Sequence, residues 1–136
     1  MPDATQRLTI RVYYEDTDFS GRVYHASYLR FFERGRTEWL RAVGFEHNQL
    51  AASSGIAFVV SKLQVEFVAP AFIDDLLEVV TELETPRGAV MNFRQMISRD
   101  GVVLANGAVD VVAIKANRAV RPPRELLQAF AQIRRR

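Results

Sequence analysis

The sequence predicts an α+β fold in which a five-stranded antiparallel sheet wraps around one long central helix. Three observations support this class. One segment of alternating apolar residues comes first, a long amphipathic segment follows it, and four further alternating segments are joined mostly by tight turns. A chain of 136 residues is long enough for one compact core, so we expect residues 1–136 to form a single domain.

The first two elements are distinguished by the spacing of their apolar residues. Strict alternation over Leu8–Glu15 predicts a strand with one buried face that ends near Glu15. Apolar residues then recur at intervals of three and four over Tyr28–Val43, which predicts an amphipathic helix of about four turns. Ser27 is the expected N-cap of this helix, and Gly44 is placed to end it as the C′ residue.

The rest of the chain is predicted to be mostly strands. The expected elements are a short helix at Asn48–Ala52, strands at Ile56–Val68, Leu76–Glu84, Met91–Ser98 and Val102–Ile114, and an amphipathic helix at about 122–135. Gly88 and Gly101 each follow a turn-forming pair of residues and supply the left-handed backbone that a hairpin turn needs. Consecutive strands joined in this way pair antiparallel.

Composition excludes several classes of function. The formal charge is +2, but 115–136 holds seven of the 18 basic residues and one acid, Glu125. Scattered basic residues of this kind form a solvated surface, so we expect no nucleic-acid binding. The absence of cysteine excludes disulfides and a thiolate nucleophile and is compatible with the cytoplasm. A polar start and no long apolar run predict a cytoplasmic protein without signal peptide or membrane segment.

An acidic segment lies between the first strand and the long helix. Glu15–Asp18 contains three carboxylates in four residues, and Gly21 follows. Turn chemistry alone explains this composition about as well as a function does, because Asp, Ser and Gly all favour turns. A calcium loop is rejected because its twelfth position, counted from Asp16, is Ser27 and not Glu. The segment could also hold an aspartyl nucleophile of the haloacid-dehalogenase type. The antiparallel strands that follow argue against this interpretation, because those enzymes need a longer chain of alternating strands and helices.

A third interpretation uses the position of the acids before a helix. The first amides of a helix are free donors at the positive end of its dipole, and they can hold a thioester carbonyl as it becomes an oxyanion. A nearby carboxylate can then attack the carbonyl or activate water. This chemistry requires neither a metal nor a cofactor, and we expect none.

Three stretches of sequence resemble a known enzyme family. Val12–Asp18, Gly21–Arg34 and Arg36–Leu40 closely resemble the 4-hydroxybenzoyl-CoA thioesterase family, and within it the branch of acyl-CoA thioesterases associated with the Tol-Pal system. The resemblance extends through Phe58–Val60 and Pro70 to about Ile114. It implies a hotdog fold, hydrolysis of short-chain, aromatic or longer acyl-CoA, and a homodimer or homotetramer with active sites at subunit interfaces.

The resemblance also assigns roles to individual residues. The family's essential aspartate falls on Asp18, as nucleophile or general base, and Asp16 is then a structural residue of the turn. The Tyr24–His25 step falls where the family offers a helix amide to the thioester carbonyl. The His25 side chain is expected to position water or substrate, with a buried structural histidine as the alternative.

Further residues are implied in coenzyme A binding. Arg87 lies near the place where the family contacts phosphates, and Ser61 and Lys62 lie on a strand that borders the cleft in relatives. Each has a plain alternative as an exposed surface residue. Glu33 and Glu38 are expected to be helix-surface or interface charges that pair with neighbouring arginines.

The sequence departs from the family at a few positions, and two other functions compete. Phe19–Ser20 stands where the branch often has two small residues, and Gly35 stands where alanine is common.

One competing hypothesis is a non-catalytic module of the same fold that binds acyl carrier protein or enzymes of phospholipid synthesis, suggested by the basic C-terminal segment. The other competing hypothesis is a hotdog-fold dehydratase. Such enzymes usually carry a histidine and an acid on a differently placed helix motif, and this sequence does not contain that motif.

Overall fold

The computed structural model describes residues 5–84 and 86–134. The other residues are 1–4, 85 and 135–136, so the first four residues of the polar start and the last two arginines of the basic segment, with the expected end of the final helix at 135, lie outside the described residues. The helical elements are η1 (Tyr14–Asp16), α1 (His25–Ala42), α2 (His47–Ser54) and α3 (Arg124–Arg134). The strands are β1 (Thr5–Arg11), β2 (Ala57–Phe67), β3 (Leu76–Leu83), β4 (Val90–Arg99), β5 (Val102–Lys115) and β6 (Arg118–Ala119).

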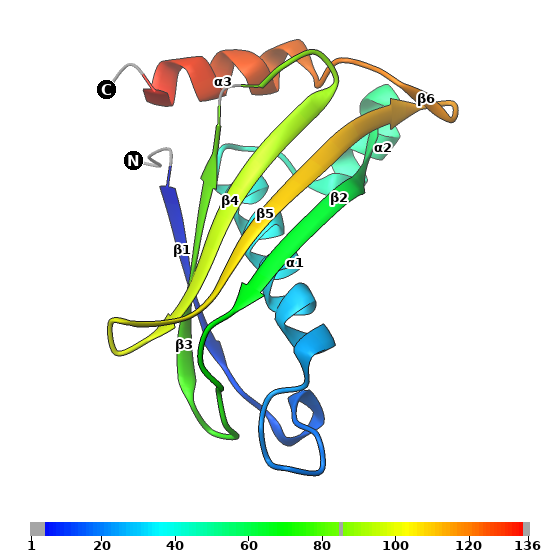
Figure 1. Ribbon diagram of the computed structural model, residues 1–136. Coiled ribbons are helices and arrows are strands. Elements are labelled where there is room, and N and C mark those ends of the chain that lie inside the picture. The colour runs from blue at the N-terminus through cyan, green and yellow to red at the C-terminus, as the bar shows by residue number, and fades with distance from the viewer. Residues whose placement is uncertain (1–4, 85, 135–136) are drawn as a thin grey trace.

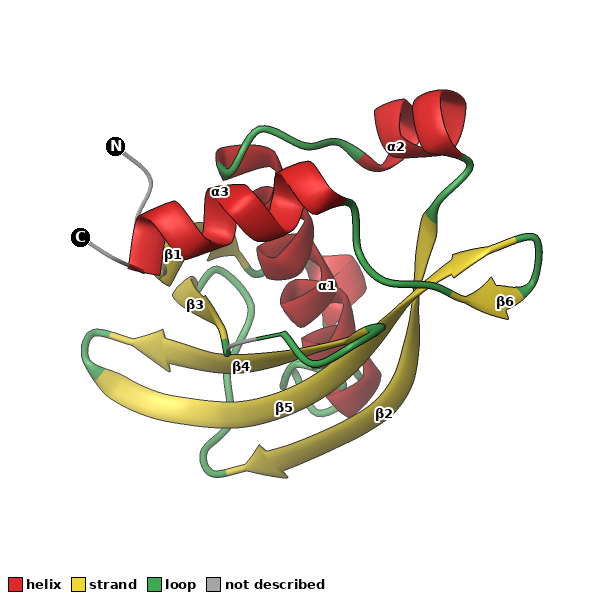
Figure 2. Ribbon diagram, turned by 90° about the horizontal axis from the view of Figure 1, so that it is seen from above, coloured by secondary structure: helices red, strands yellow, loops and turns green. Residues whose placement is uncertain are grey.

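The strands form one antiparallel sheet that curls around α1 (Figures 1 and 2). Its order is β1-β3-β4-β5-β2, and the two-residue β6 pairs with β5 off this path. All the pairings are antiparallel, as the tight turns predicted. The five-stranded sheet around a long helix that the sequence predicted is therefore confirmed, with β6 as an additional short strand.

The apolar stripe of α1 forms the centre of the core. Its buried residues are Ser27, Tyr28, Phe31, Phe32, Gly35, Trp39 and Leu40. The first half of the helix packs with Val12, Leu77 and other residues of one cluster, and the second half packs around Trp39 in another. α3 closes the second cluster, because Leu126 and Phe130 are buried against it. A side chain the size of Trp39, fully buried, contributes about 3 kcal/mol or more to stability.

A buried polar network fixes α1 on the sheet. The side-chain amide of Gln95 on β4 donates to Phe32 O and to Thr81 Oγ1, each at 2.8 Å. Gln95 Oε1 in turn accepts a hydrogen bond from Arg36 at 3.0 Å. Because each of these polar groups has a partner, the network avoids the cost of burying an unsatisfied donor or acceptor. The helix is thereby held in one position relative to β3 and β4.

β2 is an edge strand and is exposed over most of its length. It pairs with β5 on one side, and α1 packs mainly on β1 and β3 rather than on β2. Several apolar side chains of the strand are therefore open to solvent, namely Val59, Val60, Leu63 and Phe67, each with 41–49% of its surface exposed. The strand is longer and more apolar than an uncovered edge usually is.

The element boundaries differ from the predicted ones mainly around the acidic segment. The first strand ends at Arg11 and not near Glu15, because Tyr14–Asp16 forms a 3-10 turn. The long helix begins at His25, so Ser27 lies inside it and is not its N-cap. Gly44 has φ of 99° and follows the helix end as predicted. No helix in the described part of the chain has the length and apolar character needed to span a bilayer.

Candidate active site

The acidic segment forms a compact turn between β1 and α1, at the lower end of the molecule in Figure 1. Asp16 is buried, and its carboxylate accepts the Tyr13 amide at 2.8 Å. The Asp16 carbonyl also accepts the amide of Tyr24 at 2.9 Å. Asp16 thus ties the start of the turn to the start of the helix, which is the structural role expected for it.

Asp18 differs from Asp16 in being exposed to solvent. Its Oδ1 atom accepts two hydrogen bonds from Ser20, one from the amide at 2.8 Å and one from the hydroxyl at 2.5 Å. These bonds, that of the hydroxyl first, lower the pKa of Asp18 below its usual value, because they stabilise the ionised form. The turn therefore presents a charged carboxylate to solvent at neutral pH.

The N-terminus of α1 offers backbone donors beside this turn. Tyr24 is the N-cap and has an extended backbone, and no side chain caps the helix. The amide of Ser27 is bonded to Tyr24 O, but within the described residues the amides of His25 and Ala26 have no acceptor. Free amides at the start of an 18-residue helix are suited to bind a partly negative oxygen.

The side chains at the helix start are aromatic and accessible. The His25 ring lies 4.3 Å from the Tyr24 ring and 6.5 Å from the ring of Phe67, which ends β2. His25 and Tyr24 are both exposed. The alternative of a buried structural histidine is therefore wrong, and the imidazole is open to a ligand.

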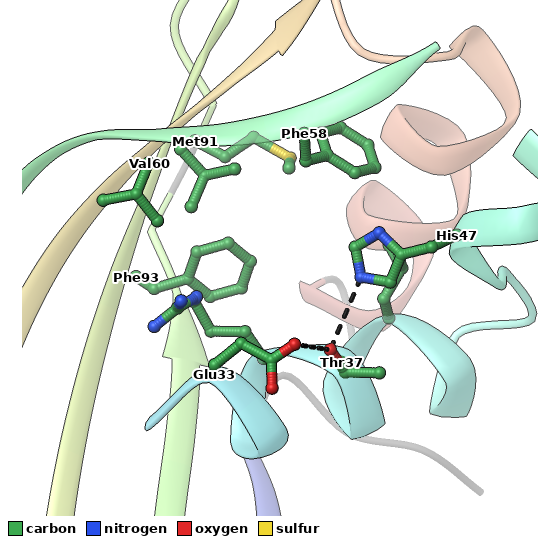
Figure 3. A pocket seen from close by; sticks show the side chains of 10 residues that line it. Glu33, Thr37, His47, Phe58, Val60, Met91 and Phe93 are labelled. Carbon is green, nitrogen blue, oxygen red and sulfur yellow. Dashed lines mark hydrogen bonds between the residues drawn. The ribbon is translucent and has the colours of Figure 1, made fainter. Parts of the chain in front are cut away.

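A second feature is a pocket farther along α1, between this helix and β2 (Figure 3). Its volume is about 140 Å³. The apolar part of the wall includes Phe58, Val60, Met91 and Phe93, which come from β2 and β4. A cavity of about 150 Å³ with apolar walls can hold a benzene molecule, so this pocket accommodates a group of that size.

Polar side chains from two helices line the other side of the pocket. Thr37 Oγ1 donates to Glu33 Oε1 at 3.3 Å and lies 3.4 Å from His47 Nε2 (Figure 3). Arg36 also lines the pocket, and partial burial lowers the pKa of its guanidinium. The pocket thus combines a hydrophobic wall with donors and an acceptor.

The pocket and the Asp18 turn do not form one site within a single chain. Thr37 lies twelve positions after His25 in α1, which corresponds to about 18 Å along the helix axis. The sequence pointed to Glu33 only as a surface or interface charge, and it did not single out Thr37 or His47. These two residues belong to different helices, and no spacing rule brings them together.

The residues expected to bind coenzyme A are dispersed. Ser61 and Lys62 lie exposed at the bulge in β2, where the Ser61 hydroxyl donates to Asp110 O at 3.3 Å. Arg87 is exposed in the turn between β3 and β4, beyond the end of β3 that lies far from Asp18. With about 3.3 Å per residue, the length of β3 separates them by roughly 25 Å in one chain.

Two other expectations about the segment can be compared with the structure. Glu38 forms a salt bridge with Arg41 at 2.6 Å, as predicted for a helix-surface charge. Among residues 5–84 and 86–134, no group of three or more acidic or histidine side chains is placed to hold a metal ion.

Comparison with known sequences finds one family model and close relatives. The model described as thioesterase-like superfamily matches residues 12–130. A relative from Haemophilus influenzae named acyl-CoA thioesterase YbgC is 41% identical over 127 residues, which cover 92% of this chain and 93% of the relative. Nearly the whole chain is therefore similar to a protein of the same length.

Solved structures resemble the chain as closely. A probable thioesterase from Bartonella henselae is 40% identical with a TM-score of 0.85, over 88% of this chain and all of the other. A mutant 4-hydroxybenzoyl CoA thioesterase complexed with 4-hydroxybenzoyl CoA has a TM-score of 0.88 over 93% of this chain and 99% of the other. At 18% identity the second likeness concerns the fold alone.

Proposed function

The chain belongs to the thioesterase-like superfamily, has the hotdog fold and is an acyl-CoA thioester hydrolase, and we propose that Asp18 supplies the carboxylate of its reaction. The observation that carries this proposal is the placement of Asp18. It is an exposed carboxylate with a lowered pKa, in the turn that leads into the unbonded first amides of α1. Asp16, the other acid of the pair, is already engaged by Tyr13.

Two reaction courses are open to this carboxylate. As a nucleophile, Asp18 attacks the thioester carbonyl, coenzyme A leaves as the thiolate, and water then hydrolyses the acyl-aspartate anhydride. As a general base, Asp18 takes a proton from water, the hydroxide attacks the carbonyl, and the tetrahedral intermediate expels coenzyme A. Both courses yield the free acid and coenzyme A, and both develop negative charge on the carbonyl oxygen.

The start of α1 is suited to stabilise that charge. We assign the His25 amide as the donor to the carbonyl oxygen, because it has no acceptor among the described residues and stands at the positive end of the helix dipole. The exposed His25 ring and the neighbouring Tyr24 ring line the approach. Their proposed role is to orient the substrate or water.

Replacement of Asp18 by Asn tests the assignment. Asn retains the shape of the side chain and removes the charge, so we expect kcat to fall by roughly a hundredfold to ten-thousandfold. Asp100→Asn is the matched control, because Asp100 is an exposed acid in a different turn, the one between β4 and β5. Near-normal release of coenzyme A by a folded Asp18→Asn protein would overturn the role of Asp18.

We propose further that the enzyme is a homodimer joined through β2. The unpaired edge of this strand and its exposed Val59, Val60, Leu63 and Phe67 support such an interface. Antiparallel pairing of the same edge in two copies is two-fold symmetric. It would cover Ser61 and Lys62 as well, which is consistent with their expected place at the border of a shared cleft. A tetramer would require a second interface.

This pairing would bring the two halves of the site together. The Phe67 end of one β2 would lie against the Ala57 end of the other, because the strands run in opposite directions. Phe67 adjoins His25, whereas Phe58 lines the pocket. We therefore propose that the Asp18 turn of one copy acts on an acyl group held in the pocket of the other. The opposite copy could likewise supply Arg87 to the phosphates of coenzyme A.

The remaining expectations about partners are proposals of the same kind. Lys115, Arg118, Arg121 and Arg124 are exposed, which suits an acidic partner such as an acyl carrier protein, or an enzyme that handles anionic lipids. A cysteine-free composition is compatible with a cytoplasmic enzyme. Turnover of a panel of short, long and aromatic acyl-CoAs, compared with the same acyl groups on a carrier protein, would identify the substrate and the carrier that presents it.

A further inference from the structure

Two hydrogen bonds from Ser20 hold one oxygen of the Asp18 carboxylate, and Arg22 also favours its ionised form. The hydroxyl of Ser20 donates to Asp18 Oδ1 at 2.5 Å, and the amide of Ser20 donates to the same atom at 2.8 Å. Two bonds to one oxygen stop the rotation of an otherwise exposed carboxylate. The other oxygen, Oδ2, is not engaged by Ser20 and is the atom left to react.

The backbone around Ser20 keeps its hydroxyl in this position. The Asp18 amide donates to Arg22 O at 2.9 Å, and the Gly21 amide donates back to Asp18 O at 3.0 Å. Gly21 has φ of 81°, a left-handed conformation that closes the turn and favours glycine. The turn is tied to the rest of the fold by bridges from Thr17 to Val23 and from Arg22 to Phe72. Ser20 is thus held from both sides of the loop.

We propose that Ser20 is a positioning residue of the hydrolase: its hydroxyl fixes Asp18 Oδ1 and thereby directs Oδ2 at the thioester or at the attacking water. The proposal rests on the assignment of Asp18 made above. Ser20 itself makes no contact with substrate in this scheme. It acts through the orientation of another group, and a misplaced reactive group lowers the rate even when its chemistry is unchanged.

The proposal separates two effects of removing the hydroxyl. The bond from Ser20 is the main cause of the lowered pKa of Asp18, so its loss moves that pKa up toward the usual value of 3.8. The acidic limb of the profile of kcat/KM against pH then moves to higher pH. At pH 7 Asp18 is ionised with or without Ser20, so any fall in kcat there reports the lost orientation.

The test compares three variants with the unchanged enzyme. Ser20→Ala removes the hydroxyl and retains the amide donor, and Ser20→Thr restores a hydroxyl. Ser53→Ala is the control, because it removes an exposed serine hydroxyl that bonds to Gln49 O in α2, outside the site. The readouts are kcat at pH 7, the pH profile of kcat/KM, the titration of the Asp18 carboxyl by NMR, and thermal unfolding.

For Ser20→Ala we expect kcat at pH 7 to fall by roughly tenfold to a hundredfold, with an upward shift of both the acidic limb and the NMR midpoint. Ser20→Thr should recover most of the loss, and Ser53→Ala should match the unchanged enzyme. An unchanged kcat, or an unchanged NMR midpoint, in Ser20→Ala would overturn the proposal. If instead Asp18 is not catalytic, Asp18→Asn retains activity, and the two failures are thereby distinguished.

Discussion

Gly35 of α1 and Thr81 of β3 lie so close together that a β-carbon at position 35 would stand 2.6 Å from Thr81 Oγ1. It would also stand 2.8 Å from Val79 Cγ1 and 2.9 Å from Gln95 Nε2. These neighbours are buried and belong to the network that holds the helix on the sheet. The helix approaches the sheet as closely as a glycine allows, and Arg36, which lines the pocket, follows directly.

Gly35→Ala should therefore destabilise the protein, although alanine favours helices more than glycine does. The added methyl forces Thr81, Val79 or Gln95 to move, and overpacking of this kind costs about 1–3 kcal/mol, which exceeds the gain of about 1 kcal/mol in helix propensity. Urea unfolding followed by the fluorescence of Trp39, the single tryptophan, measures the change. In a background of Thr81→Ala the penalty should shrink. A Gly35→Ala protein with higher stability would contradict the close packing.

The proposed interface predicts that a charge on the β2 edge separates the subunits. Leu63→Lys places an ammonium group in the middle of the strand, where a dimer would bury it without a partner. We expect a folded monomer that has lost most of its hydrolase activity. Light scattering coupled to size-exclusion chromatography and a coenzyme A release assay measure the two effects.

A matched control uses an equally exposed apolar residue elsewhere. Val102 begins β5, directly after the turn that joins β4 and β5, and is 56% exposed. Val102→Lys should leave both mass and activity unchanged. If Leu63→Lys remains a fully active dimer, the interface lies on another surface.

The pocket predicts which substrates a bulky substitution excludes. Val60 lines the pocket, and Val60→Trp fills a large part of its roughly 140 Å³. Hydrolysis of acyl-CoAs with a ring or a chain of about six carbons should fall at least tenfold, because a group of benzene size no longer fits. Acetyl-CoA, which leaves the pocket mostly empty, should be affected much less.

The neighbouring residue serves as the control for this substitution. Val59 is exposed to a similar degree but does not line the pocket. Val59→Trp should retain the original order of substrate preference. Equal losses for acetyl and aromatic substrates in Val60→Trp would show that the pocket does not hold the acyl group. Comparison of molecular mass for both variants separates this outcome from loss of the dimer.

Apolar periodicity predicted most of the fold but failed in the segment before α1. Tyr14 continues the alternation of β1, yet it is 83% exposed, because the Asp16 carboxylate captures the Tyr13 amide and starts a 3-10 turn. Ser27 has the composition of an N-cap, but the backbone is already helical at His25. Local hydrogen bonds decide such boundaries, and hydrophobic spacing carries no information about them.

The site was predictable in part for a similar reason. Asp18 was singled out as the candidate carboxylate through the family resemblance, since spacing alone did not separate it from Asp16. The structure separates the two residues by burial and by their partners. The meeting of Thr37 with His47 was not predictable, because it depends on how α2 turns back against α1. The space between β2 and α1, which forms the pocket, likewise arises only in the assembled sheet.

The exposed edge of β2 also has a consequence for how the protein is made in the cell. A newly synthesised copy has an 11-residue edge strand with unpaired backbone groups and only two charged residues, Lys62 and Glu66. Such an edge pairs readily with strands of unrelated unfolded chains. If the proposed dimer forms through this edge, its assembly competes with misassembly, and the yield of native enzyme then depends on how soon a second copy arrives.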